Sequence, residues 1–315
     1  MRRERLTPAA SYIRRLSPAG RAAQLCALRR IASWWKRRPV SDPLPLRWET
    51  WTYRHSARLR DFLGEHYAPA SGNRMLSALR GTLRECWRLG LLSWDDCQRA
   101  SDVASFRFRR MARGRLLTAA ELGQLFAAAG QGDRTGARDV ALLALLYAAG
   151  LRRKESASVQ LADLDQTTGS IRVTGGKGCR ERTAHLGHAI AQVSPWLVLR
   201  GAHPGPLVCL IDREGRVLPD RPMSTATVGR LVARAGERAG LGLVRPHDLR
   251  RSFASHLLAH GGDVFQVQRL LGHADVSTTA LYDVRGDDAA AALQRQLPLP
   301  APPRRADRRL HDDQL

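Results

Sequence analysis

The sequence predicts a mainly α-helical protein with a small antiparallel β-sheet, an α+β fold arranged in two domains. Apolar residues recur at helical spacing through most of the chain. Residues 171–174 and 180–186 alternate instead, and they flank a glycine-rich turn, which predicts a β-hairpin. The length of 315 residues exceeds that of one typical domain, so we expect two.

Four helices are expected in the N-terminal part of the chain. Ser17 followed by Pro18 predicts the start of the first, because Ser is a favoured N-cap and Pro suits the first helical turn. Apolar stripes predict three more helices over residues 48–67, 71–91 and 94–103. The residues before Ser17 are basic, and we expect them to form a loose extension.

Charge indicates the class of partner. The formal net charge of +22 and the pI near 11.3 favour a polyanion, and nucleic acid is the one we expect. Five cysteines without a C-x-x-C pair indicate neither a disulfide framework nor a zinc site. The sequence shows no signal-peptide pattern and no apolar run near the ~18 residues of a membrane span. We therefore expect a cytoplasmic protein that does not contact a membrane.

Residues 106–116 form the expected linker between the domains. They include the stretch FRFRRMARGR, with five arginines in ten residues. A solvated linker and a linker that lies on DNA phosphates both have this composition, so both interpretations stay open. The candidate DNA-binding residues of the linker are Arg107, Arg109, Arg110, Arg113 and Arg115.

The second domain begins with a T-x-x-E capping box at Thr118. A buried helix is expected over residues 138–149, ended by Gly150. Arg152 and Glu155 follow at once. Taken alone, they are best explained as a helical surface pair worth about 0.2–0.5 kcal/mol.

Lys177 lies at the tip of the predicted hairpin, between glycines. Only three of the 51 lysine and arginine residues are lysines, so a lysine at this position is unusual for this chain. An exposed hairpin charge is the simpler explanation. Against it, lysine can give up a proton, which arginine in practice cannot.

Residues 245–282 carry the densest set of chemical groups. His247 and Arg250 are three residues apart at the start of a predicted helix, so both can project from one side. A second helix over 264–271 ends before His273, and Tyr282 follows nine residues later. Each residue taken singly could be structural, but the ordered set argues for a site. The pairs His256 with His260 and His185 with His188 lack further donors, so we expect no metal there.

These segments resemble the catalytic boxes of the tyrosine recombinase, or phage integrase, family, and most of all its Xer-like members. The matching patterns are Y-x-x-G-L-R-x-x-E from Tyr147, the hairpin lysine, and H-x-L-R, L-G-H and a final tyrosine from His247 onward. Ser156 stands where the family usually has Leu, and Ala184-His185-Leu186 stands where it has Val-Pro-Leu.

The resemblance implies a domain plan. Residues 1–15 would be a basic extension, 16–105 a helical SAM-like core-binding domain that contacts DNA, and 106–116 the linker. Residues 117–297 would be the tyrosine-recombinase catalytic domain, with a last helix over 287–297. Residues 298–315 are rich in Pro and charge, and we expect them to be disordered.

The resemblance also assigns roles. Arg152 and Arg250 would hold the scissile phosphate, with Glu155 in support. Tyr282 would be the nucleophile that forms a 3′-phosphotyrosine. The other expected catalytic residues are His247, accepting the tyrosine proton, Lys177, protonating the leaving 5′-oxygen, and His273, hydrogen-bonding the phosphate. No metal, ATP or other cofactor is expected.

The expected activity is site-specific DNA cleavage and rejoining on double-stranded DNA with paired inverted half-sites. The expected assembly is a tetramer on DNA, of this chain alone or with a related recombinase, at the bacterial nucleoid. A type IB topoisomerase would share the chemistry but act as a monomer without a defined pair of sites. A DNA-binding regulator on an inactive recombinase fold is the third interpretation, and the six filled catalytic positions argue against it.

Overall fold

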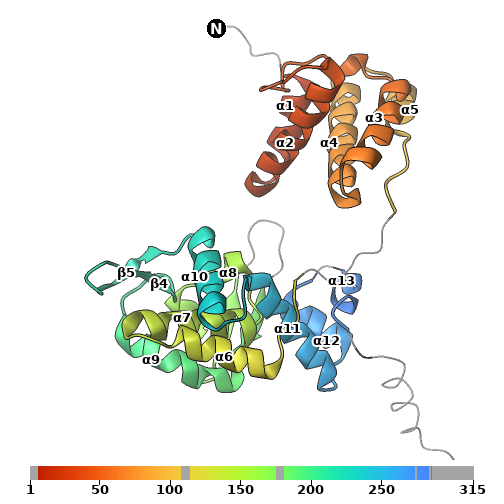
Figure 1. Ribbon diagram of the computed structural model, residues 1–315. Helices are drawn as coiled ribbons and strands as arrows, with labels where there is room; N and C mark the ends of the chain where they lie inside the picture. The colour runs from red at the N-terminus through yellow and green to blue at the C-terminus, as the bar shows by residue number, and fades with distance from the viewer. Residues whose placement is uncertain (1–5, 108–113, 175–180, 274, 284, 286–315) are drawn as a thin grey trace, which may run out of the picture. The chain divides into compact units, whose positions relative to one another are not determined.

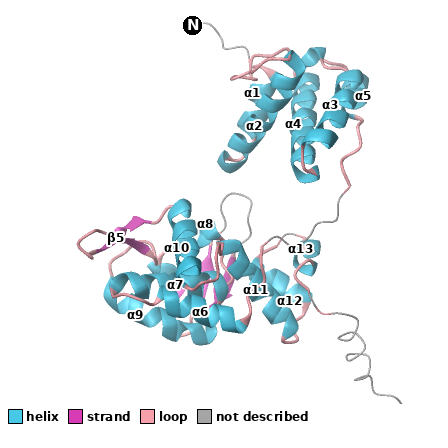
Figure 2. Cartoon of the chain, in the orientation of Figure 1, coloured by secondary structure: helices cyan, strands magenta, loops and turns pink. Residues whose placement is uncertain are grey.

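The computed structural model describes residues 6–107, 114–174, 181–273, 275–283 and 285 (Figure 1). The chain forms two compact units, divided between Arg110 and Met111. Helices dominate both units, and in the described part of the chain all β-strands belong to the second unit (Figure 2). The expected mainly helical fold with small antiparallel sheets is confirmed.

The described part of the first unit is a bundle of helices around an aromatic core. Its elements are α1 (Pro8–Arg15), α2 (Pro18–Lys36), the 3₁₀ turn η1 (Trp48–Thr50), α3 (Tyr53–His66), α4 (Pro69–Arg88) and α5 (Trp94–Ser101). Ser17 caps α2 as expected, since its hydroxyl accepts from the Gly20 amide at 3.3 Å. Trp48 and Trp51 are fully buried, with ring centroids 5.8 Å apart. They pack with the leucines of α3 and α4.

The expectation that the residues before Ser17 form a loose extension is wrong for Pro8–Arg15, which form helix α1. The Ser11 hydroxyl donates to Glu85 Oε2 on α4 at 2.6 Å, and Arg15 Nη1 lies 3.2 Å from Glu85 Oε1. A Cβ at Gly81 would lie 2.2 Å from Tyr12 Cε2, so this glycine lets α1 approach α4. An eight-residue helix is marginal on its own. Its contacts with α4 stabilise it.

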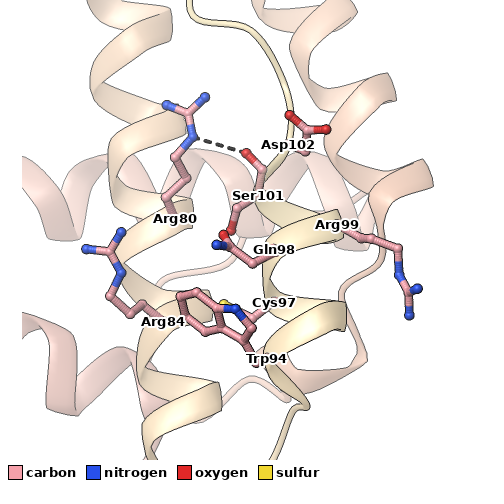
Figure 3. Close-up of a pocket in the computed structure, with 8 residues that line it drawn as sticks. All are labelled: Arg80, Arg84, Trp94, Cys97, Gln98, Arg99, Ser101 and Asp102. Atoms are coloured by element: carbon pink, nitrogen blue, oxygen red, sulfur yellow. Dashed lines mark hydrogen bonds between the residues drawn. The ribbon is translucent and has the colours of Figure 1, made fainter.

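A hollow between α4 and α5 is lined by polar and basic side chains (Figure 3). Arg80 donates through Nε to the Ser101 carbonyl at 3.3 Å, and a second nitrogen donates to the Val103 carbonyl. Further along, Asn73 exchanges two hydrogen bonds with the Phe106 backbone, at 2.7 and 2.9 Å. The chain as far as Phe106 is therefore held on the first unit.

The second unit combines helices with two small antiparallel sheets. Its first part contains α6 (Ala119–Ala129), α7 (Arg134–Tyr147), α8 (Arg153–Ser158), η2 (Leu161–Asp163), β1 (Leu164–Asp165), β2 (Ser170–Val173) and β3 (Arg182–His185). Its second part contains η3 (Gly187–Ala189), α9 (Ile190–Arg200), β4 (Cys209–Ile211), β5 (Val217–Pro222), α10 (Thr225–Arg238), α11 (Pro246–Ala259), α12 (Val264–Leu271) and α13 (Val276–Ala280). The strands form one sheet of order β1-β2-β3 and the pair β4-β5.

Several sequence predictions agree with these elements. The predicted hairpin is the antiparallel pair β2-β3, in which Ile171 is paired with Ala184. Thr118 and Glu121 form the expected capping box of α6. Helix α7 is the expected buried helix and packs against α9. The sequence did not predict the two-residue strand β1 or the pair β4-β5, which are short and lack clear alternation.

Some expectations fall on residues outside the described ranges. They include the position of Lys177, the linker arginines Arg109, Arg110 and Arg113, the helix over 287–297 and the tail 298–315. Within the described residues, no helix combines the length and the apolar character that a membrane crossing requires.

Replacing Ser11 with Ala should destabilise the first unit. The change removes the buried hydroxyl that donates to the Glu85 carboxylate, and a hydrogen bond to a charged group is worth about 1.5–3 kcal/mol. Denaturant unfolding followed by tryptophan fluorescence measures this, because that unit holds every tryptophan except Trp196. The matched control is Ser41→Ala at an exposed serine. Equal unfolding midpoints for the two variants would contradict the docked α1.

Candidate active site

Helix α11 presents two of the expected site residues near its N-terminus. Asp248 closes a capping box by accepting from the Arg245 amide at 2.8 Å, and Pro246 occupies the first helical position. These features explain why the helix begins here. His247 is exposed, whereas Arg250 is only 3% exposed. The imidazole can therefore reach a substrate from the surface, and the guanidinium lies within the protein.

Arg250 is held by groups from two other segments. One terminal nitrogen donates to the Gly150 carbonyl after α7. The other donates to the Leu271 carbonyl at 2.6 Å and to His273 Nε2 at 3.1 Å. Burial, with the nearby cation Arg152, lowers the pKa of Arg250 to about 9, so it stays protonated at neutral pH. The result is a fixed, mostly desolvated positive charge.

Glu155 on α8 accepts hydrogen bonds from two arginines. Arg152 donates its amide to Oε2 at 2.8 Å and Nη1 to Oε1 at 2.7 Å. Arg182 donates Nη1 to Oε1 at 3.0 Å and Nη2 to Oε2 at 2.8 Å. Burial alone would raise the pKa of Glu155, but these hydrogen bonds outweigh it and lower the pKa to about 2. Glu155 is therefore an anion shared between the arginines.

Arg182 is the residue of this cluster that the sequence prediction missed. It begins β3, and its side chain is only 9% exposed. Its Nε donates to the Leu270 carbonyl of α12 at 2.9 Å. A signal was present: the alternation that turns Ala184 inward turns Arg182 to the same face of the strand. A charged residue on a core-facing position indicates a buried partner.

His273 follows the end of α12 and faces the cluster. Arginine only donates, so His273 Nε2 accepts from Arg250, and Nδ1 carries the proton that it donates to Thr279 Oγ1 at 2.9 Å. Burial and the adjacent Arg250 lower the pKa of His273 to about 4. The ring is thus neutral at pH 7, and in this arrangement it orients Arg250.

Tyr282 lies two residues beyond α13 and is 5% exposed. Its amide donates to the Thr279 carbonyl at 2.9 Å, and its own carbonyl accepts from Ser255 Oγ at 2.8 Å. Its ring centroid is 6.0 Å from that of His273 and 6.4 Å from that of His247. Burial raises the pKa of Tyr282, while nearby arginines oppose this. The phenol is therefore protonated at neutral pH.

The linker end lies against α11 beside His247. The Arg115 amide donates to Asp248 Oδ1 at 2.9 Å, and the Leu117 amide donates to Ser252 Oγ at 2.8 Å. Gly114 has a φ of +91°, and a Cβ there would lie 2.5 Å from Asp248 Oδ1, so a glycine fits this approach. The chain enters the second unit in a fixed position next to the site.

The structure brings most of the expected site residues together. The cluster contains the expected residues Arg152, Glu155, His247, Arg250, His273 and Tyr282, together with Arg182. The expected members outside the described residues are Lys177, Arg109, Arg110 and Arg113. Arg107 is exposed on the first unit. The Arg115 guanidinium pairs with Glu121 and donates to the Leu241 carbonyl at 2.8 Å.

Positive charge at the cluster comes from arginine side chains. In the described part of the chain, no group of three or more His, Cys, Asp or Glu residues could hold a metal ion. His256 and His260 lie within hydrogen-bonding distance of other groups. His256 Nδ1 is 3.0 Å from the Tyr147 hydroxyl, and His260 Nδ1 is 2.8 Å from the His256 carbonyl. Three guanidinium groups around one carboxylate form a site suited to a phosphate.

Comparison with known proteins gives the family. Residues 115–286 match the Phage integrase family. Tyrosine recombinase XerD of Xanthomonas campestris pv. campestris is 38% identical over 231 residues, which cover 69% of this chain and 68% of that protein. Tyrosine recombinase XerC of Azotobacter vinelandii is 35% identical over 240 residues, which cover 74% and 77%.

Solved structures share the fold at lower identity. The Tn1549 transposon integrase in complex with transposon right end DNA is similar with a TM-score of 0.65 and 15% identity, over 91% of this chain and 98% of that chain. The XerH site-specific recombinase bound to difH gives a TM-score of 0.63 and 18% identity, over 88% and 79%.

Residues 115–286 match the Phage integrase family, and the XerD and XerC relatives are 38% and 35% identical to this chain. The chain therefore belongs to the phage integrase family and is a Xer-like tyrosine recombinase, an enzyme that cuts and rejoins DNA at specific sites.

Proposed function

We propose that this recombinase acts on double-stranded DNA with paired inverted half-sites, as a tetramer of this chain or with a related recombinase, at the bacterial nucleoid. We also propose that cleavage proceeds through a 3′-phosphotyrosine on Tyr282. The observation that carries the proposal is the cluster of Arg152, Arg250 and Glu155 beside Tyr282, with His247 next to the tyrosine ring. Lambda integrase, whose fold is similar, is a dimer bound to a COC′ core site, and this supports pairing on DNA.

Arg152 and Arg250 bind the non-bridging oxygens of the scissile phosphate. A phosphodiester carries one negative charge, and more develops in the transition state. Preorganised donors that meet this charge in a desolvated site lower the barrier. Arg250 is already buried and fixed by carbonyls, so little reorganisation is needed when the phosphate arrives.

Tyr282 attacks the phosphorus, and the bond to the 5′-oxygen breaks. His247 accepts the phenolic proton, which is needed because burial keeps the phenol protonated. Lys177 donates a proton to the leaving 5′-oxygen. Both ring nitrogens of His273 are occupied, by Arg250 and Thr279, so we assign His273 to orienting Arg250. The phosphotyrosine retains the free energy of the phosphodiester, so the reverse attack by a 5′-hydroxyl rejoins DNA without ATP.

The first unit and the linker bind the DNA backbone around the site. Arg107 is exposed and suits this task. Arg109, Arg110 and Arg113 suit it by their charge. Arg115 has a different role, because its guanidinium is occupied by Glu121 and the Leu241 carbonyl. We assign Arg115 to fixing the linker on the second unit.

Tyr282→Phe should bind DNA normally and form no covalent complex. The phenyl ring keeps its packing against Leu258 and Leu271, while the nucleophilic oxygen is lost. A nicked suicide substrate followed by denaturing gel electrophoresis measures the covalent product. Tyr53→Phe, at a tyrosine exposed on the first unit, is the matched control and should still trap DNA. A covalent band from Tyr282→Phe would place the nucleophile elsewhere.

Lys177→Ala should cleave an ordinary phosphodiester very slowly. It should cleave a 5′-bridging phosphorothiolate at close to the wild-type rate. The leaving alkoxide has a conjugate acid with a pKa near that of water, ~15.7. A thiol has a pKa of about 8.5, so sulfur leaves without a donated proton. Lys154→Ala, at an exposed lysine, is the control. An equal loss of cleavage rate on both substrates would show that Lys177 is not the general acid.

Excess EDTA should leave the rate of covalent-complex formation unchanged, because arginines supply the charge that a metal would otherwise provide. The measurement is single-turnover cleavage of the suicide substrate with and without the chelator. A loss of cleavage that added Mg²⁺ restores would show that the arginines are insufficient.

A further inference from the structure

We infer that Arg182 is a positioning residue for the phosphate-binding arginines. By hydrogen-bonding to both oxygens of the Glu155 carboxylate, it keeps Arg250 from hydrogen-bonding to that anion and leaves Arg250 available to the phosphate. The inference rests on the proposed role of Arg152 and Arg250, and it names a residue that does not itself touch the reacting atoms.

Arg182 and Arg250 approach the same oxygen atom. Arg182 Nη2 donates to Glu155 Oε2 at 2.8 Å, whereas Arg250 Nη1 makes only a long ion pair with that oxygen, at 4.0 Å, which is too far for a hydrogen bond. Without Arg182, Oε2 would retain only the Arg152 amide, and it would be a buried anion beside a buried cation. Such groups pair when nothing separates them. Arg250 would then rotate onto Glu155 and away from the phosphate.

Backbone carbonyls at the C-terminal end of α12 bind the three arginines. Three consecutive carbonyls each accept from a different one: Leu270 from Arg182 at 2.9 Å, Leu271 from Arg250 at 2.6 Å, and Gly272 from Arg152 at 2.7 Å. Helix C-terminal carbonyls are without helical partners and carry partial negative charge, so they suit cations. Arg182 thus has its own carbonyl and does not compete for those that hold its neighbours.

Charge balance points to the same role. Three guanidinium groups and one carboxylate leave an excess of two positive charges in this group of side chains. A pentavalent phosphorus transition state approaches two negative charges, which this excess complements. Loss of Arg182 would halve the excess and leave Glu155 to neutralise one of the two arginines that bind the phosphate.

Arg182→Met tests the inference, with Arg172→Met as the matched control. Arg172 lies on the adjacent strand β2 and pairs with Asp163 at 3.2 Å, but its side chain is 66% exposed. Single-turnover formation of the covalent complex should slow on the order of 100-fold for Arg182→Met, as for loss of an oxyanion donor. Affinity for DNA should change little. Arg172→Met should stay within about fivefold of wild type in rate. Equal rates for the two variants would overturn the inference.

A double mutant separates positioning from simple bracing of the hairpin. In the Glu155→Gln background the anion is gone, so Arg182→Met should cost much less than in wild type. If Arg182 only braces β3 on the Leu270 carbonyl, its loss should cost the same in both backgrounds.

A phosphorothiolate substrate separates Arg182 from the hairpin lysine. Arg182→Met should be slow on both the phosphodiester and the 5′-bridging phosphorothiolate, because it affects phosphate charge and not the leaving group. Recovery on the phosphorothiolate would mean that Arg182 acts through Lys177, which would overturn the inference.

Arg182→Lys covers the case in which the methionine variant does not fold. Lysine restores the charge but not the paired donors, so its rate should fall between wild type and Arg182→Met, and well below that of Arg172→Lys. Equal rates for the two lysine variants would reject the inference. Failure of the proposed function is distinguishable, because a wild-type chain that forms no covalent complex, or a Tyr282→Phe chain that does, bears on Tyr282 alone.

Discussion

The candidate site depends on how three arginines are held close together at the end of one helix. Like charges repel, and a buried guanidinium is costly unless its donors are satisfied. The carbonyls of Leu270, Leu271 and Gly272 take one arginine each, and Glu155 supplies a full negative charge between them. This arrangement keeps the excess positive charge within the protein before any phosphate is present.

The nucleophile's segment is tied to the same cluster. His273 accepts from Arg250 on one side of its ring and donates to Thr279 on the other, and the Thr279 carbonyl accepts from the Tyr282 amide. Gly150, with φ +58°, lets the chain after α7 approach Phe253 on α11, which places the Gly150 carbonyl against Arg250. A change in the arginines is therefore expected to move Tyr282 as well.

Local patterns in the sequence determined much of this protein. Capping and helix-breaking residues predicted where these helices begin and end: α12 spans the expected residues, and Ser17 caps α2. Alternation around a glycine turn identified β2 and β3. The order and spacing of chemical residues from Tyr147 to Tyr282 gave the family resemblance and, with it, the activity. Each of these features is encoded within a few residues or in their order along the chain, so no tertiary information was needed.

Tertiary structure decided the contacts between distant polar groups. Helix α1 is held in place because Ser11 meets Glu85, which is 74 residues away, and a helix of only eight residues is marginal without such contacts. The role of Arg182 depends on Glu155, 27 residues earlier, and on the Leu270 carbonyl, 88 residues later. Sequence periodicity shows which face of an element turns inward. It does not show which donor meets which acceptor there, because the packing of separate elements sets those distances.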